Sequence, residues 1–150
     1  MARKFLQDIL DNMNLEVTIE TIPSEDIYTF NVSGQNLGIL IGKHGQTLDA
    51  LQYLVNLAAN RNERQRMRFI VDVENYRSRR AETLQNLAKN LADRAIKMDQ
   101  EVKLEPMNRH ERRVIHASLQ DNDKVTTYSK GEEPHRYIII SPKRYEKTKK

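Results

Sequence analysis

Two glycines in the 150-residue chain bracket a pair of polar residues, in the order Gly42, Lys43, His44, Gly45. Glycine has no Cβ atom, so a phosphate group can approach its backbone closely. The loop runs into a segment with helical periodicity, whose first N–H groups and positive dipole end attract anions. Lys43 adds a full positive charge. The loop therefore predicts a phosphate contact, although its spacing also fits a tight helix–turn–helix connection in which the glycines serve only the backbone.

A second candidate site consists of Arg112 and His116, which are four positions apart. Residues four apart on a helix lie on one face, so both side chains can hold the same anion. Arg109 comes three positions before Arg112, on nearly the same face. The alternative interpretation is a solvated helix face that carries its histidine by chance.

A third group of basic residues leads from the end of a predicted helix into a predicted strand: Arg61, Arg64, Arg66 and Arg68. These arginines fit either contacts to phosphates or an ordinary solvated loop, and the sequence favours neither. Ile39 and Ile41 precede the glycine loop and are candidates for an apolar floor beneath nucleic-acid bases.

The periodicity of apolar residues predicts the elements around the glycine loop. Helical spacing is found at 3–13, 35–41 and 46–60, and strand-like segments at 15–21, 27–32 and 67–73. The predicted order in the first half is therefore helix, strand, strand, helix, helix, strand. The glycine loop lies between its last two helices.

The second half is predicted to contain two helices packed on a small sheet. An apolar stripe marks a long helix over 76–98, and Pro106 is expected to open another helix that runs to about residue 120, since proline is tolerated in a first helical turn. Residues 124–128 and 136–140 are expected to pair as a hairpin.

The charge is divided unevenly between the two halves. Residues 1–75 hold seven Lys and Arg against ten Asp and Glu, a net charge of −3, whereas residues 76–150 hold eighteen against eleven, a net charge of +7. Binding to a nucleic-acid backbone depends on how many phosphates are neutralised. We therefore expect the second half to supply most of the salt-dependent attraction to an anionic partner.

The composition argues against a secreted or membrane protein. The chain has no cysteine, so it has neither disulfides nor thiolate metal sites. It has no apolar run of the roughly 18 residues that cross a bilayer, and no signal-peptide pattern at its start. We expect a cytoplasmic protein with no membrane insertion.

The sequence lacks the motifs of several common enzyme classes. The segment from Gly38 to His44 is one residue short of a nucleotide-binding P-loop and ends in histidine where a hydroxyl should bind magnesium. His110 and His116 are six apart, whereas a zinc-protease helix needs histidines four apart. We predict that the protein is not an enzyme and uses no cofactor and no metal. The alternatives are a protein-interaction module and a nuclease with His116 as acid or base.

Both candidate sites lie in segments that resemble known domains. The element order with its glycine loop resembles a type II KH domain, whose GxxG loop clamps nucleic-acid backbone. The segment from Gly38 to Tyr53 resembles the KH domain of the bacterial Jag family, also called KhpB or EloR. The segments 106–120, 126–131 and 136–139 resemble an R3H domain, named for its Arg-x-x-x-His motif.

The resemblance covers essentially the whole chain and implies an α+β fold. A type II KH domain (α-β-β-α-α-β) is expected over residues 1–75, followed by a small α/β R3H domain over residues 76–150 that includes the helix 76–98. Single-stranded RNA is the expected ligand, with single-stranded DNA left open. The residues expected to contact it are Gly42, Lys43, His44, Gly45, Arg109, Arg112 and His116.

The resemblance also implies a biological role and a partner. Members of the family are regarded as RNA chaperones and post-transcriptional regulators that affect cell elongation and wall growth. Many pair with a small single-KH protein, and a homodimer is the other pairing that we consider. Longer members carry an additional N-terminal domain and a charged linker, so roles that depend on that domain are not expected of this chain.

Overall fold

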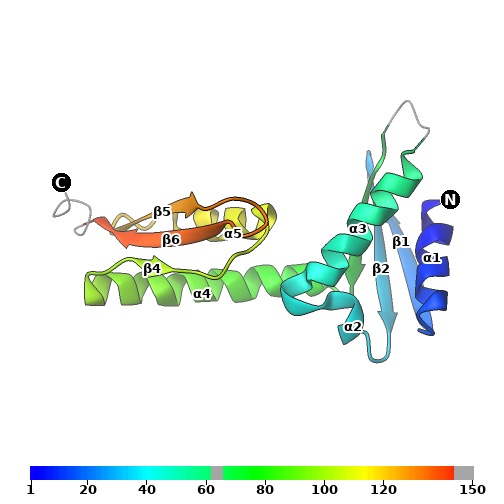
Figure 1. Ribbon diagram of the computed structural model, residues 1–150, viewed down its shortest axis with the longest axis horizontal. Helices are drawn as coiled ribbons and strands as arrows, with labels where there is room; N and C mark the ends of the chain where they lie inside the picture. Colours follow the sequence, from blue (N-terminus) through cyan, green and yellow to red (C-terminus); the bar gives the residue numbers. More distant parts are fainter. Residues whose placement is uncertain (62–65, 144–150) are drawn as a thin grey trace. The chain divides into compact units, whose positions relative to one another are not determined.

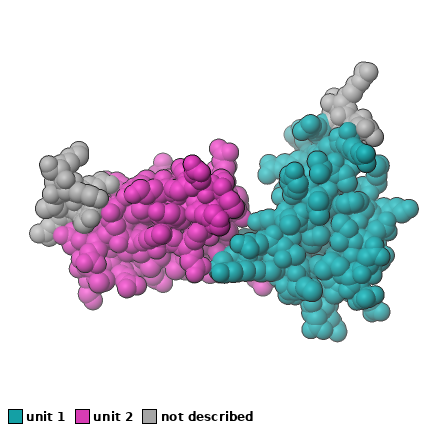
Figure 2. Space-filling model, in the orientation of Figure 1, with its two compact units in different colours: residues 1–78 teal, residues 79–150 magenta. Residues whose placement is uncertain are grey.

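The computed structural model describes residues 1–61 and 66–143 (Figure 1). The chain forms two compact units, residues 1–78 and 79–150 (Figure 2). Each unit has its own three-stranded sheet and its own hydrophobic core. Among the described residues, no helix combines the length and the apolar character needed to cross a membrane.

The first unit has the element order that the sequence predicts, α-β-β-α-α-β. Its elements are α1 (Ala2–Asn12), β1 (Val17–Pro23), β2 (Ile27–Gly34), α2 (Gly38–Ile41), the 3-10 turn η1 (Lys43–Gly45), α3 (Gln46–Ala59) and β3 (Arg68–Val73). The first residues of α4 (Tyr76–Met98) also belong to this unit. The helix expected over 35–41 is shorter than predicted, since α2 begins only at Gly38.

The sheet of the first unit has the strand order β1-β2-β3. Strands β1 and β2 are antiparallel, and β2 and β3 are parallel, with Val32 opposite both Ile19 and Val73. Alternate strand residues enter a core shared with Leu6 of α1 and Val55 of α3. Full burial of one such side chain contributes about 1.5–3 kcal/mol, so this core fixes the helices that flank the glycine loop.

Helix α3 also binds the backbone of β3 through a row of amide side chains. Asn56 donates to the Phe69 carbonyl at 2.7 Å and accepts from the Phe69 N–H at 2.8 Å. Asn60, the C-cap of α3, makes the same pair of bonds to Met67, the residue before β3, at 2.8 and 2.9 Å. Since β3 is an edge strand, these bonds satisfy backbone groups that a neighbouring strand would otherwise take.

The second unit contains most of α4 and a small antiparallel sheet. Its further elements are β4 (Val102–Lys103), α5 (Arg109–Leu119), β5 (Val125–Lys130) and β6 (Tyr137–Pro142). The strand order is β4-β6-β5. The apolar stripe of α4 is buried as predicted, and its Leu84 and Ala88 pack with Ile115 of α5 and Ile138 of β6 in one core.

Two features of the second unit differ from the sequence-based expectation. Pro106 does not open a helix, because α5 begins at Arg109 with Asn108 as its N-cap. The Asn108 side chain accepts a hydrogen bond from the Glu111 N–H at 2.8 Å, which satisfies a donor that the first helical turn leaves free. Strand β4 was not expected and pairs with β6 at Ile139 and Ile140.

Candidate nucleic-acid interface

The GxxG loop has backbone geometry that favours glycine at both of its ends. Gly42 has φ 71° and Gly45 has φ 82°, in the region that side-chain-bearing residues rarely adopt. A Cβ atom on Gly45 would also lie 2.9 Å from Cε1 of Tyr76. Space and dihedral angle therefore both require glycine at position 45.

The loop presents its lysine beside the start of a helix. Lys43 is exposed and His44 is half-buried, whereas Gly45 is buried and is the N-cap of α3. Because the cap residue has no side chain, it cannot satisfy the first N–H groups of α3. Ile39, in the helix before the loop, is 62% exposed, as a floor for bases requires. The predicted loop residues thus lie together at one helix N-terminus.

Tyr76 and Arg77, at the start of α4, pack against this loop and the first turn of α3. Arg77 pairs with Asp49, in the first turn of α3, at 2.7 Å. Its Nε also donates to the Val71 carbonyl at 3.0 Å. These contacts tie the first turn of α3 to the end of β3. Both residues belong to the second half as predicted from the sequence, and no local pattern marks them as supports of the loop.

In the second unit, Arg112 does not lie free on the surface of α5. Its side chain is 7% exposed. One nitrogen donates to the Met107 carbonyl at 2.6 Å, and another pairs with the carboxylate of Glu133 in the turn between β5 and β6. Spacing along the helix predicts the direction of a side chain but not how deeply it is buried.

The other two residues of this predicted site are exposed. Arg109 lies in the first turn of α5, and His116 lies in its last turn. The Nδ1 atom of His116 hydrogen-bonds Oγ1 of Thr127 on β5. The structure therefore places Arg109 and His116 at the surface and Arg112 beneath the β5–β6 turn.

His116 borders an open cleft of about 640 Å³ between α5 and β5. Arg113 and Lys143 also line this cleft, and both are exposed. Asp121 and Asp123 line it as well, so its charge is mixed. Arg113 and Lys143 are not among the site residues predicted from the sequence. The position of Arg113 next to Arg112 could have indicated a role at this site. Lys143 is distant from α5 in the sequence, so only the fold shows that it lines the cleft.

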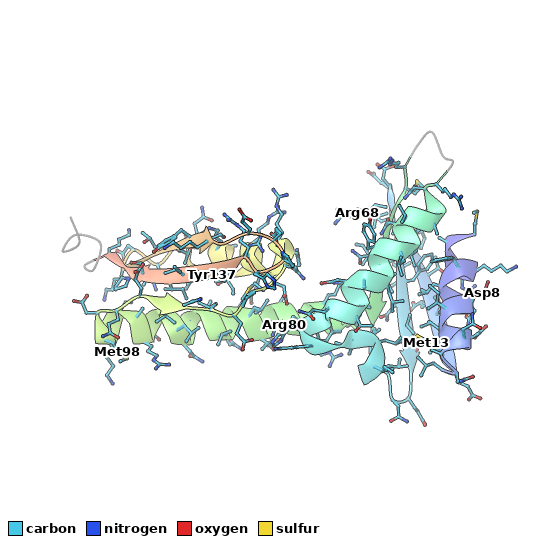
Figure 3. All side chains as sticks on the ribbon, viewed as in Figure 1. Asp8, Met13, Arg68, Arg80, Met98 and Tyr137 are labelled. Atoms are coloured by element: carbon cyan, nitrogen blue, oxygen red, sulfur yellow. The ribbon has the colours of Figure 1, made fainter. Side chains whose placement is uncertain are left out.

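A buried ion pair holds α5 against α4. Glu111 and Arg80 pair at 2.6 Å, with side chains 7% and 16% exposed (Arg80 is labelled in Figure 3). A buried carboxylate needs such a partner, because losing it would leave an uncompensated charge. The pair therefore fixes the helix that carries Arg109 and His116.

The third group of arginines lies near an exposed apolar stripe on α3. Arg61, Arg66 and Arg68 are exposed, and Arg64 lies outside the described residues (Arg68 is labelled in Figure 3). These three arginines line a pocket of about 850 Å³ together with apolar residues of the stripe, Tyr53, Leu54 and Leu57. Tyr53 is 66% exposed. This surface thus combines positive charge with apolar area.

Comparison with known proteins identifies both halves of the chain. The model of the KhpA/KhpB KH-domain family matches residues 1–71, and the model of the R3H-domain family matches residues 82–142. RNA-binding protein KhpB of Bacillus subtilis is 40% identical over 145 residues, which are 95% of this chain and 70% of the relative. The chain belongs to the KhpB family. Membership confirms the resemblance to the Jag family and the α+β fold with a KH domain followed by an R3H domain.

Other KhpB proteins match with similar coverage of this chain. RNA-binding protein KhpB of Clostridium symbiosum is 49% identical over 145 residues, which are 95% of this chain. RNA-binding protein KhpB of Streptococcus pneumoniae is 35% identical over 137 residues. The chain spans 65% of the clostridial relative and 42% of the pneumococcal one.

Proposed function

We propose that the chain binds single-stranded RNA through one surface on each domain. The first surface is the GxxG loop, formed by Gly42, Lys43, His44 and Gly45. The second lies on α5 and includes Arg109, Arg112 and His116. The observation that carries the proposal is the exposed Lys43 beside the N-terminus of α3, whose cap residue, Gly45, makes no side-chain hydrogen bond to the helix. The name RNA-binding protein, borne by relatives that match 95% of the chain, supports the choice of ligand.

The proposed division of the chain follows the charge. The KH domain, proposed over residues 1–75, has a net charge of −3, and the R3H domain, proposed over residues 76–150, has +7. Single-strand binding weakens with salt at a slope of about −0.7 for each phosphate neutralised. The second domain therefore supplies most of the salt-dependent attraction, and the GxxG loop positions the strand locally.

The role proposed for the protein is binding without catalysis. It acts as an RNA chaperone and post-transcriptional regulator in the cytoplasm, linked to cell elongation and wall growth as the family resemblance implies. The cleft beside His116 contributes contacts to the strand, and no step in this role requires a cofactor or a metal.

Titration of a labelled single-stranded RNA with the full chain at several salt concentrations tests this function. We expect saturable binding that weakens with salt, and weaker binding to an RNA duplex of the same length, because bases in a duplex cannot lie beside the loop. A single-stranded DNA of matching sequence shows whether the sugar matters. Absence of binding to single-stranded RNA at low salt would contradict the proposal.

A second activity, pairing with another KH chain, is favoured by the apolar stripe on α3. Tyr53, Leu54 and Leu57 are all exposed, and together they offer apolar area to a protein partner. We propose that a small single-KH protein or a second copy of this chain packs there. Light scattering over a range of concentrations tests the homodimer, with Leu57→Asp expected to give only monomer. A monomer at every concentration, together with no binding to a purified single-KH protein, would refute the pairing.

A further inference from the structure

Three arginines act electrostatically on the carboxylate of Glu133 in the second unit. Arg112 forms an ion pair with it from beneath the β5–β6 turn. The hydrogen bond from Arg112 holds the pKa of Glu133 below its ordinary value of 4.5. Desolvation of the carboxylate opposes this shift, and the charges of Arg112, Arg136 and Arg109 lower the pKa further. The charges of three arginines thus favour the ionised form of this carboxylate.

The two members of the ion pair differ in how firmly they are held. The Arg112 side chain is 7% exposed and also donates to the Met107 carbonyl, a bond that does not involve Glu133. The Glu133 side chain is 55% exposed and lies in the turn between β5 and β6. If the pair opens, the carboxylate can move into water, whereas the guanidinium stays in place. A buried guanidinium without an anion is costly, so the place that Glu133 leaves favours another anion.

We propose that Arg109, Arg112 and Arg136 form a binding site for one phosphodiester group of single-stranded RNA, which Glu133 fills in the free protein. A phosphodiester has the same charge as a carboxylate and offers a guanidinium two oxygens in a similar geometry. Exchange of one anion for the other keeps Arg112 paired throughout. The site rests on the proposed function, and it explains how a buried arginine contacts RNA.

The other two arginines are placed to help the exchange. Arg109 is exposed in the first turn of α5. Arg136 is half-buried and donates to the Gly131 carbonyl at 2.7 Å, so it is anchored in the same turn as Glu133. A phosphate that takes the place of the carboxylate therefore meets a charged group on α5 and another on the turn.

Replacement of Glu133 by glutamine tests the exchange, because the amide oxygen can still accept from Arg112 but no longer carries charge. Glu132→Gln is the matched control: it removes the same charge from the same turn. With a single-stranded RNA probe and the full chain, we expect E133Q to bind about five-fold or more tightly than E132Q, as removal of one charge a few ångströms from a phosphate implies. The effect should shrink at high salt.

Equal affinities of E133Q and E132Q, or weaker binding by E133Q, would overturn the proposal and make Glu133 a residue that positions the turn. Should E133Q fail to fold, Arg109→Gln serves instead, with Arg94→Gln on the exposed side of α4 as its control. We expect the Arg109 variant to bind at least about three-fold more weakly than the control, and equal affinities would overturn the site. If the unaltered chain does not bind RNA, the proposed function itself fails, which is a different result.

Discussion

Tyr76, the first residue of α4, lies against Gly45, the last residue of the GxxG loop. A Cβ atom on Gly45 would come within 2.9 Å of the tyrosine ring. The next residue, Arg77, pairs with Asp49 in the first turn of α3. The start of α4 therefore belongs to the structure that shapes the loop, although it follows the last strand of the KH domain in sequence.

Substitution of Gly45 by alanine should destabilise the protein, and Gly38→Ala should not. At Gly45 the new methyl meets Tyr76 and the backbone has φ 82°, which costs about 1–2 kcal/mol for a residue with a side chain. Gly38 lies in α2 with open space around its Cβ position. Alanine there should leave stability unchanged or raise it by up to about 1 kcal/mol. Urea unfolding measures both variants, and equal free energies of unfolding would show that the contact with Tyr76 does not constrain the loop.

Reversal of charge in the GxxG loop should weaken RNA binding without loss of stability. Changing Lys43 and His44 both to aspartate sets negative charge against a phosphate, and aspartate tolerates the positive φ of 54° at position 44 better than most residues do. We expect affinity for single-stranded RNA to fall at least about ten-fold, with an unchanged melting temperature.

Lys4→Asp on α1 is the control for this loop variant, since Lys4 is also exposed and lies in the same unit. It should bind nearly as the unaltered chain does. If the loop variant binds like the Lys4 variant, the loop does not contact the strand.

Replacement of His116 by alanine should weaken RNA binding, because its exposed side chain borders the cleft between α5 and β5. We expect the loss of affinity to be smaller for His116→Ala than for Arg112→Ala. His110→Ala, on the same helix and also exposed, should bind nearly as the unaltered chain does. Fluorescence anisotropy measures the affinities, and equal affinities of the two histidine variants would remove His116 from the interface.

The ion pair of Glu133 should appear in the acid stability of the protein. Because its pKa in the folded state is lowered, the ionised carboxylate contributes stability that is present above about pH 4.5 and is lost as the pH falls through the folded value. The difference in free energy of unfolding between the unaltered chain and Glu133→Gln should therefore be constant near pH 6 and shrink toward pH 3. Glu132→Gln corrects for the general effect of charge. A difference that stays constant down to about pH 3 would contradict the lowered pKa.

The sequence predicted the architecture of the first unit well. Periods of two and of three to four residues distinguish its strands from its helices, and Gly42 and Gly45 mark the loop between α2 and α3. The amide row of α3 was not recognised, because Asn56 and Asn60 are ordinary residues for an exposed helix face. Only the fold brings them to the edge of β3.

Three features of the second unit could not be predicted from local sequence patterns. Strand β4 has two residues, too few for any alternation to be visible. Helix α5 begins after Asn108 and not at Pro106, because the Asn108 side chain accepts a hydrogen bond from an N–H group of the first helical turn. The buried Arg112 pairs with Glu133, which is 21 residues away in the chain. A contact between residues so far apart in the chain cannot be predicted from the spacing of neighbouring residues.

Ultraviolet crosslinking of the full chain to a single-stranded RNA, followed by mass spectrometry of the crosslinked peptides, tests the two-surface interface most directly. We expect crosslinks in the peptides around the GxxG loop and in those that contain α5 or the β5–β6 turn, with both groups reduced by excess unlabelled RNA. Crosslinks confined to other segments, or to only one of the two domains, would contradict binding by both surfaces.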